Sequence, residues 1–324
     1  MQPWRSSVSN TKAIPHKLSN NMIELSCLQK KFGSRLAVSN LSLSVPRGEI
    51  FGLLGHNGAG KSTTIGMMLG QVWPTSGEVK VCGHDVTKHR AKALHSVGAI
   101  FEAPAFYDYL SGWRNLEILS HYTAPTSKER IREVVDWVGL TGREQSAVKT
   151  YSHGMRARLA LAQALLPQPE LLILDEPGSG LDPEGIAEMR QTILRLHREL
   201  GLTILLSSHL LTEVEQLCTR IAVLHRGEKV FDGTVADVKS ARGRVALRTK
   251  DFVAAVTLLC EQKLTSGSEG TEFILLNDGV TTAEVTRTLV QAGHAVEGIW
   301  AREQTLEDFY LELVKTSSAT RKQN

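Results

Sequence analysis

The sequence predicts an α/β fold in which buried strands alternate with helices. Three short apolar runs, at 50–54, 171–174 and 203–207, are rich in leucine and isoleucine and too short for typical helices. Each run is followed by glycine or polar residues and then by a segment with helical periodicity. That order is typical of a parallel sheet flanked by helices. The glycine-rich stretch at 55–63, between the first run and a helix, narrows the prediction to the P-loop class of nucleotide-binding folds.

The stretch 55–63 has the G-x-x-x-x-G-K-S pattern of a phosphate-binding loop. Its glycines let backbone N–H groups converge on phosphate oxygens, and the helix at 61–69 adds the positive end of its dipole. Lys61 is expected to reach the β- and γ-phosphates, and the Ser62 hydroxyl to ligate Mg²⁺. A glycine-rich turn without a ligand is the alternative, which the complete pattern after a strand disfavours. The nucleotide-binding residues predicted here are Gly55, His56, Asn57, Gly58, Ala59, Gly60, Lys61, Ser62 and Thr63.

Length and composition limit the class of protein. The 324 residues are enough for about two domains, and 42% hydrophobic with 22% charged residues predicts a large core. A net charge of +3 is too small to indicate nucleic acid as a partner. The four cysteines form no C-x-x-C pair, which favours buried thiols in a reducing compartment. No apolar run approaches the roughly 18–20 residues of a membrane helix, so we expect a cytosolic protein that meets a membrane only through a partner.

The first half of the chain is expected to combine strands and helices around the P-loop. Segments that alternate apolar and polar residues predict antiparallel strands with one buried face. They lie at 23–27 and 41–45, with a further short strand at 78–82, a helix at 88–96 and an apolar strand at 97–101 that ends before Pro104. Helical periodicity then dominates at 113–122, 127–138 and 152–166, where Ser152 is a candidate N-cap. After the second buried strand come a helix at 183–199, the third buried strand, a helix up to Cys218 and a hairpin at 221–231.

These segments group into two domains. We expect residues 1–20 to be a flexible arm and residues 21–241 to be the nucleotide-binding domain, with an antiparallel β subdomain and a helical subdomain at about 103–166. From about Arg242 a different alternation of short strands and helices predicts a small C-terminal α+β module with a polar tail, 242–324. Its predicted strands and helices are 245–248, 252–261, 272–276, 281–292, 296–300 and 306–314, with a flexible loop at 265–270.

Acidic and imidazole side chains follow the second and third buried strands. Asp175 and Glu176 end the run at 171–174, the Walker B form, in which the first carboxylate holds the Mg²⁺ shell and the second orients or deprotonates the attacking water. His209 follows the strand at 203–207; a lone histidine is more often structural, but the carboxyl ends of parallel strands carry ligand sites. The predicted catalytic residues are therefore Lys61, Glu176 and His209.

Together these motifs resemble the nucleotide-binding subunit of an ABC transporter. The resemblance covers about residues 22–235 and more loosely the tail, with the motifs in the order of that family. Besides the P-loop and Walker B, they are Glu102 at the Q-loop position, Tyr151-Ser152-His153-Gly154-Met155 at the signature position, Ser179-Gly180-Leu181-Asp182 at the D-loop and Ser207-Ser208-His209 at the H-loop.

The resemblance implies ATP and Mg²⁺ as cofactors and a head-to-tail dimer of two copies. ATP would lie between the P-loop of one copy and the signature of the other, where Ser152 and Gly154 at a helix N-terminus contact the γ-phosphate. Asp182 would cross the dimer interface, and His209 would hold the γ-phosphate. Phe32, which by itself fits either the core or base stacking, falls at the position of the aromatic residue that stacks on adenine.

Two departures from the family pattern point to one branch. Glu102 replaces the usual glutamine, and His153 replaces a glycine. Both replacements resemble the motifs of one branch of the family, the exporters for peptide antibiotics such as bacitracin and lantibiotics. In that branch a soluble ATPase serves a separate membrane permease. The stretch 305–309 resembles the tails of that class. This implies an ATP-hydrolysing exporter subunit on the inner face of the cell membrane. Glu102 is expected either to ligate Mg²⁺ and transmit the nucleotide state to residues 103–110, or only to cap the corner at 101–103.

Other functions remain as alternatives. A soluble ABC ATPase acting on ribosomes or DNA typically carries two cassettes or a long coiled coil, whereas this chain has one P-loop and no sustained heptads. A non-hydrolysing regulatory module is disfavoured by Lys61, Asp175 and Glu176. An importer ATPase is the nearest alternative, because its distinguishing features lie mostly in the membrane partner.

Overall fold

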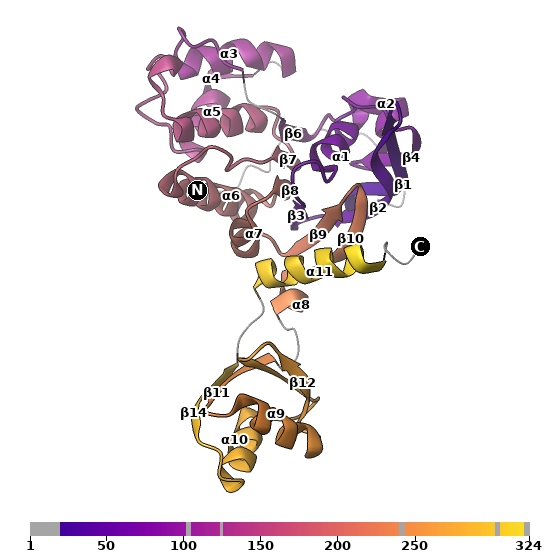
Figure 1. Ribbon diagram of the computed structural model, residues 1–324. Coiled ribbons are helices and arrows are strands. Elements are labelled where there is room, and N and C mark those ends of the chain that lie inside the picture. The colour runs from indigo at the N-terminus through magenta and orange to yellow at the C-terminus, as the bar shows by residue number, and fades with distance from the viewer. Residues whose placement is uncertain (1–19, 102–104, 124–125, 240–243, 302–304, 321–324) are drawn as a thin grey trace.

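The computed structural model describes residues 20–101, 105–123, 126–239, 244–301 and 305–320 (Figure 1). The predicted arm at 1–20 lies almost wholly outside these residues. The described chain forms a large body, a smaller unit at 244–301, and a last helix that returns to the large body. None of the described helices combines the length and apolar character needed to cross a membrane.

The large body is built on a six-stranded sheet with the order β10-β9-β3-β8-β7-β6. All neighbours run parallel except β10, which pairs antiparallel with β9. The central strands are buried on both faces, which explains their continuous apolar runs. The strands are β3 (Ile50–Leu54), β6 (Val97–Ile100), β7 (Leu171–Asp175), β8 (Thr203–Ser208), β9 (Arg220–His225) and β10 (Glu228–Thr234).

The register of this sheet brings three strand ends to one level. Leu54 at the end of β3 pairs with Ser208 of β8, and Asp175 at the end of β7 pairs with Ser207 of β8. The residues that follow these three strands therefore meet at the carboxyl edge of the sheet, where ligand sites of parallel sheets lie.

A four-stranded antiparallel sheet, β2-β1-β4-β5, forms the predicted β subdomain beside the first sheet (Figure 1). Its core contains Leu25 and Val79, which share a cluster with Phe51 of β3 and with Ile65 and Met68 of the P-loop helix. Helix α2 starts earlier than predicted because Asp85 caps it by accepting from Thr87 N. The elements are β1 (Asn21–Phe32), β2 (Arg35–Pro46), α1 (Lys61–Met68), β4 (Ser76–Val81), β5 (His84–Asp85) and α2 (Val86–Ala93).

Helices cover the other side of the large body, as the periodicity predicts. Their amphipathic faces bury Leu116, Ile131, Val135 and Leu161 in one cluster with the central sheet. The helices are α3 (Gly112–Thr123), α4 (Lys128–Trp137), the 3₁₀ turn η1 (Val148–Thr150), α5 (His153–Leu165), α6 (Pro183–Leu200), α7 (Leu211–Leu217) and α8 (Val235–Lys239).

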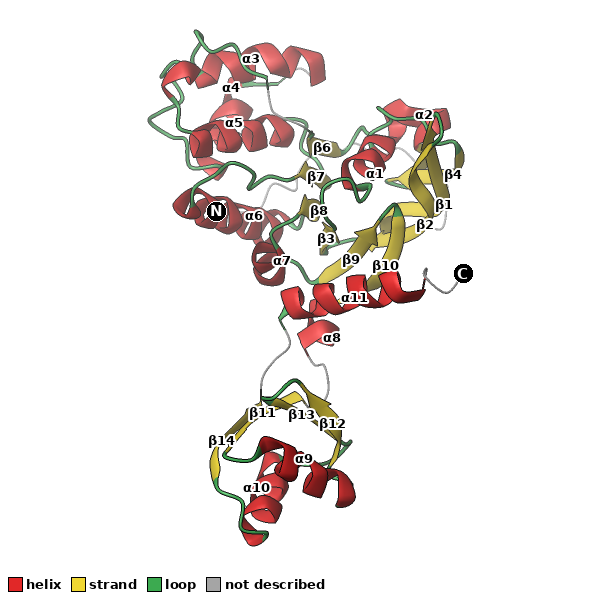
Figure 2. Cartoon of the chain, in the orientation of Figure 1, coloured by secondary structure: helices red, strands yellow, loops and turns green. Residues whose placement is uncertain are grey.

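The unit at 244–301 has its own core and a four-stranded antiparallel sheet with the order β12-β13-β11-β14 (Figure 2). Two helices pack on this sheet. The predicted loop at 265–270 was wrong, because residues 265–269 form β12; the segment lacks a strand composition, and its pairing with β13 imposes the conformation. The elements are β11 (Arg244–Thr249), α9 (Phe252–Glu261), β12 (Thr265–Glu269), β13 (Phe273–Leu276), α10 (Thr282–Gln291) and β14 (Val296–Ala301).

The last helix, α11 (Leu306–Thr320), packs on the large body, whereas the sequence predicted a helix at 306–314 within the small C-terminal module. It packs against α7 and α8, and its Leu306 and Tyr310 belong to the core of the large body. Phe309 meets Phe231 of β10 at 4.7 Å between ring centroids, and Tyr310 meets His56 of the P-loop edge-on at 4.9 Å. The sequence shows only that α11 is amphipathic, and the body that its apolar face completes is decided by tertiary packing.

The cysteine prediction is only partly confirmed. All four cysteines are free thiols. Cys218 is buried as expected and Cys82 is partly buried, but Cys27 and Cys260 are exposed.

We predict that Tyr310→Ala lowers the free energy of unfolding of the large body by about 3 kcal/mol, because it removes a ring that is only 4% exposed. Tyr310→Phe should retain most of the stability, because it keeps the buried ring. Urea unfolding followed by tryptophan fluorescence measures both. Leu311→Ala, on the exposed side of the same helix, is the control, and equal midpoints for all three variants would contradict the packing of α11 on the core.

Candidate nucleotide site

The P-loop between β3 and α1 has two positions that only glycine fits. Gly55 has φ +154°, and a Cβ there would lie 2.5 Å from the carbonyl oxygen of Leu224. Gly60 has φ +105°, and a Cβ would lie 2.8 Å from the carbonyl oxygen of Ala37. These glycines let the loop press against neighbouring backbone and turn directly into α1. The N-terminus of that helix therefore opens at the site, as a phosphate requires.

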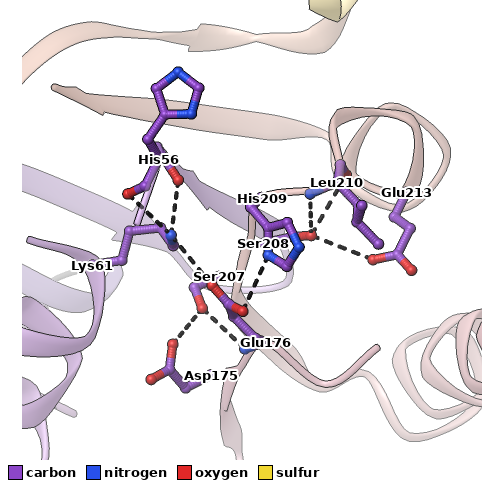
Figure 3. A network of polar contacts seen from close by, with 10 residues as sticks. His56, Lys61, Asp175, Glu176, Ser207, Ser208, His209, Leu210 and Glu213 are labelled. Carbon is purple, nitrogen blue, oxygen red and sulfur yellow. Dashed lines mark hydrogen bonds and ion pairs between the residues drawn. The ribbon is translucent and has the colours of Figure 1, made fainter. Parts of the chain in front are cut away.

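Lys61 is the first residue of α1 and is only 4% exposed. Its Nζ donates to the carbonyl oxygens of Gly55, at 2.8 Å, and His56, at 3.5 Å. The same Nζ lies 3.3 Å from Oε1 of Glu176 (Figure 3). A buried ammonium group needs such oxygens around it, because an unpaired buried charge is strongly unfavourable.

Asp175 and Glu176 are held by one hydroxyl group. The Oγ–H of Ser207, on β8, donates to Oδ1 of Asp175. The Ser207 Oγ also accepts the backbone N–H of Glu176, at 3.0 Å (Figure 3). Glu176 has φ +49°, a left-handed conformation that is uncommon for residues other than glycine. This bend turns the Glu176 carboxylate toward Lys61 rather than along the strand.

His209 completes the group at the sheet edge. Its Nδ1 lies 3.1 Å from Oε2 of Glu176, so one carboxylate contacts Lys61 through one oxygen and His209 through the other. The structure thus brings the three predicted catalytic residues together from three different strand ends. A carboxylate between a cation and an imidazole can accept a proton from water or orient a water molecule for attack.

Two cavities border this group. One of about 290 Å³ is lined by P-loop residues, by Glu176 and by Arg35. The other, of about 550 Å³, is lined by Ser62, Asp175, Glu176 and by His153 and Arg156 of α5. A hydroxyl and a carboxylate in one cavity are the hard oxygen donors that Mg²⁺ prefers, so these residues fit the predicted ion. The P-loop residues in the smaller lining are Asn57, Gly58, Gly60, Lys61, Ser62 and Thr63.

Among the described residues, Phe32, Ser152, Gly154 and Asp182 do not line these cavities within one chain. Ser152 caps α5 by accepting from Met155 N at 3.2 Å, with Gly154 in the first turn. Asp182 is exposed and caps α6 by accepting from Gly185 N at 2.9 Å. Phe32 is 50% exposed at the end of β1, with Lys30 Nζ 4.7 Å from its ring centroid. Glu102 lies outside the described residues, so its two alternative roles stay predictions.

Sequence reasoning missed two residues of the site. Arg35 pairs with Phe32 across the β1–β2 hairpin and lines the P-loop cavity. The only available signal was a basic residue after the hairpin turn, and nothing local shows that this hairpin lies over the P-loop. Ser207 was predicted only as a member of the H-loop motif and not as a residue that holds Asp175 and Glu176. A polar residue in an otherwise apolar strand is the available signal, because a fully buried hydroxyl needs a hydrogen-bond partner.

Comparisons with known proteins show which family this chain resembles. A family model described as ABC transporter matches residues 38–179. An uncharacterised ABC transporter ATP-binding protein of Bacillus subtilis, YhcH, is 41% identical over 90% of this chain and 95% of its own length. The bacitracin transport ATP-binding protein BcrA of Bacillus licheniformis is 37% identical over 91% and 98%. The daunorubicin resistance ATP-binding protein DrrA3 of Streptomyces coeruleorubidus is 34% identical over 91% and 96%.

A solved structure confirms the predicted fold class. The structure of cbiO1 from Clostridium perfringens, part of the ABC transporter complex cbiONQ, aligns with a TM-score of 0.63 and 25% sequence identity. It covers 69% of this chain and 92% of the other chain. The large body is therefore an ABC-type P-loop ATPase fold.

We predict that Arg35→Ala weakens ATP binding by about 3- to 10-fold, because it removes a guanidinium group from the wall of the P-loop cavity. The maximal rate of hydrolysis should stay within about twofold, because Arg35 forms part of the cavity wall and is not among the described residues that pair with the Glu176 carboxylate. Titration with a fluorescent ATP analogue measures the affinity. Arg132→Ala, an exposed arginine on α4, controls for net charge, and equal affinities of the two variants would remove Arg35 from the site.

Proposed function

The chain belongs to the ATP-binding, ATP-hydrolysing proteins of ABC transporters, and from this premise we propose that it drives an exporter whose membrane permease is a separate polypeptide. The full-length similarity to proteins named for bacitracin transport and daunorubicin resistance supports export of an antibiotic-like compound. The observation that carries the enzymatic part is the Glu176 carboxylate held between Lys61 and His209 at a P-loop.

The proposed hydrolysis assigns one role to each of these side chains. Lys61 contacts the β- and γ-phosphates, and its attraction to them weakens its ion pair with Glu176. Glu176 then orients the attacking water or accepts its proton, and His209 holds the γ-phosphate. Ser62 and Asp175 hold Mg²⁺, which supplies positive charge against the phosphates. The Ser207 hydroxyl keeps Asp175 and Glu176 in their relative positions.

A second copy of the chain completes the proposed site. Ser152 and Gly154 lie at the N-terminus of α5, whose backbone N–H groups suit the γ-phosphate of the partner copy. Asp182 is exposed and available for contact across a head-to-tail interface. Phe32 offers a half-exposed ring for stacking on adenine. Each of these residues has an accessible face in the single chain, as contact with a second copy requires.

The proposed permease contact is the loop before α3. Tyr109 is 73% exposed and Tyr107 is 44% exposed in the segment that follows the Q-loop position. Exposed aromatic side chains are enriched at protein interfaces, which supports docking of the permease here. The protein would then lie on the cytoplasmic face of the cell membrane, attached through the permease, with no nucleic acid as a partner.

The test of the proposed function is purification of the tagged chain from detergent-solubilised membranes. A co-purifying protein with several membrane helices, whose reconstitution stimulates ATP hydrolysis and drug export, supports the proposal. Tyr109→Ala should reduce that recovery while leaving hydrolysis by the isolated chain unchanged. Recovery of ribosomes or DNA in place of a membrane protein would instead support the soluble ABC ATPase.

We predict that Lys61→Ala lowers ATP hydrolysis at least about 100-fold, because it removes the cation that contacts the phosphates. A phosphate-release assay on purified protein measures the rate, and circular dichroism checks that the variant is folded. Turnover like that of the wild type would refute the site.

We predict that Glu176→Gln retains ATP binding but lowers hydrolysis by about 100-fold or more, because the amide has the same shape and no basic oxygen. The ATP-bound variant should accumulate as a dimer, since hydrolysis no longer opens it. Size-exclusion chromatography with and without ATP measures this. A monomer at ATP concentrations that saturate the variant would argue against the head-to-tail dimer.

A further inference from the structure

Glu213 is a half-buried acid on α7 that the proposed mechanism leaves unused. Its Oε2 lies 3.3 Å from the Oγ of Ser208, which donates to it (Figure 3). Ser208 is itself buried, and its Oγ accepts the backbone N–H of Leu210 at 2.9 Å. These two hydrogen bonds fix the backbone on both sides of His209, the residue between them in the chain.

The second oxygen of Glu213 points to Gly178, the residue just before the D-loop. A Cβ built on Gly178 would lie only 2.7 Å from Oε1, so this carboxylate packs directly against the chain two residues beyond Glu176. Oε1 is buried and has no hydrogen-bond partner among the described residues. Burial raises the pKa of the Glu213 carboxyl, while the Ser208 hydrogen bond and the charges of His209 and Arg190 oppose the increase.

We propose that Glu213 is a positioning residue for ATP hydrolysis, which joins the H-loop at Ser208 to Gly178, the residue that precedes the D-loop. His209 follows Ser208 directly, and Glu176 lies two residues before Gly178; the side chains of His209 and Glu176 meet at 3.1 Å. Glu213 accepts a hydrogen bond from Ser208 and lies against Gly178, so it would set the distance between the imidazole and the carboxylate without touching ATP. The inference rests on the roles proposed above for Glu176 and His209, but not on the transported compound.

The unpartnered Oε1 of Glu213 favours one movement of the neighbouring D-loop over others. A buried carboxylate oxygen without a donor is unfavourable, so a D-loop movement that brings a backbone N–H to Oε1 is stabilised. The D-loop is the segment proposed to meet the second copy through Asp182. Formation of the dimer would in this way act on His209 and Glu176 through Glu213.

The test compares steady-state hydrolysis by full-length variants without a permease. Glu213→Ala should lower kcat about 10-fold through misplacement of the reacting groups, with KM for ATP within about twofold because the P-loop is untouched. Glu213→Gln, which keeps the shape and an oxygen for Ser208, should restore most of kcat. Thr212→Ala, exposed on the same helix, is the matched control and should behave as wild type.

A double variant separates positioning from general destabilisation. Ser208→Ala with Glu213→Ala should be no slower than Glu213→Ala alone, because both substitutions break one connection; independent effects on kcat would multiply.

Gly178→Ala, which pushes Oε1 of Glu213 away from this part of the chain, should also lower kcat severalfold. It tests the same contact if Glu213→Ala does not fold. Wild-type kcat in Glu213→Ala or Gly178→Ala, or a loss that appears in KM and in the unfolding midpoint instead of kcat, would overturn the proposal. Normal hydrolysis by Glu176→Gln would overturn the proposed mechanism rather than this contact.

Discussion

The site depends on keeping the ammonium group of Lys61 charged inside a nearly closed pocket. At 4% exposure this group has lost most of its water, and only protein oxygens can compensate for that loss. Two of them are P-loop carbonyl oxygens, and the third belongs to Glu176, from a strand end more than 100 residues away in the chain. The Glu176 carboxylate reaches Lys61 only because β3, β7 and β8 end at one level and because Glu176 adopts φ +49°. The sheet register and one unfavourable backbone conformation thus serve the same ion pair.

In the proposed mechanism, that ion pair also connects nucleotide binding to the activation of water. Phosphate oxygens that enter the P-loop compete with Glu176 for Lys61, because both are anionic oxygens seeking the same donor. The carboxylate released from Lys61 still contacts His209 and remains anchored through its backbone N–H to Ser207. It can therefore turn toward a water molecule without losing its place at the sheet edge. Under this mechanism, one carboxylate shared by Lys61 and His209 would make the proposed catalytic base respond to the substrate.

The sequence predicted the parts of this site that lie at strand ends. Buried runs of leucine and isoleucine identify parallel strands, and the residues that follow such strands meet at one edge of the sheet. The sequence could therefore predict that Lys61, Glu176 and His209 lie together, as the structure shows. Arg35, Glu213 and Tyr310 were not found, because each reaches the site from an element whose docking is decided by tertiary packing. The same reason explains the misassigned strand at 265–269, which forms only because β13 is beside it. Local propensity says little about such long-range pairing.

The position of α11 ties the small unit to the P-loop. The chain leaves the large body after α8, forms the unit at 244–301, and returns as α11, which packs on α7 and α8. Tyr310 of α11 touches His56, and Glu307 and Leu311 border a cavity of about 200 Å³ that His209 also lines. A partner that binds the small unit and moves α11 must therefore change the contacts of a P-loop residue. Because such coupling is reciprocal, ATP binding would change the affinity for that partner by the same factor.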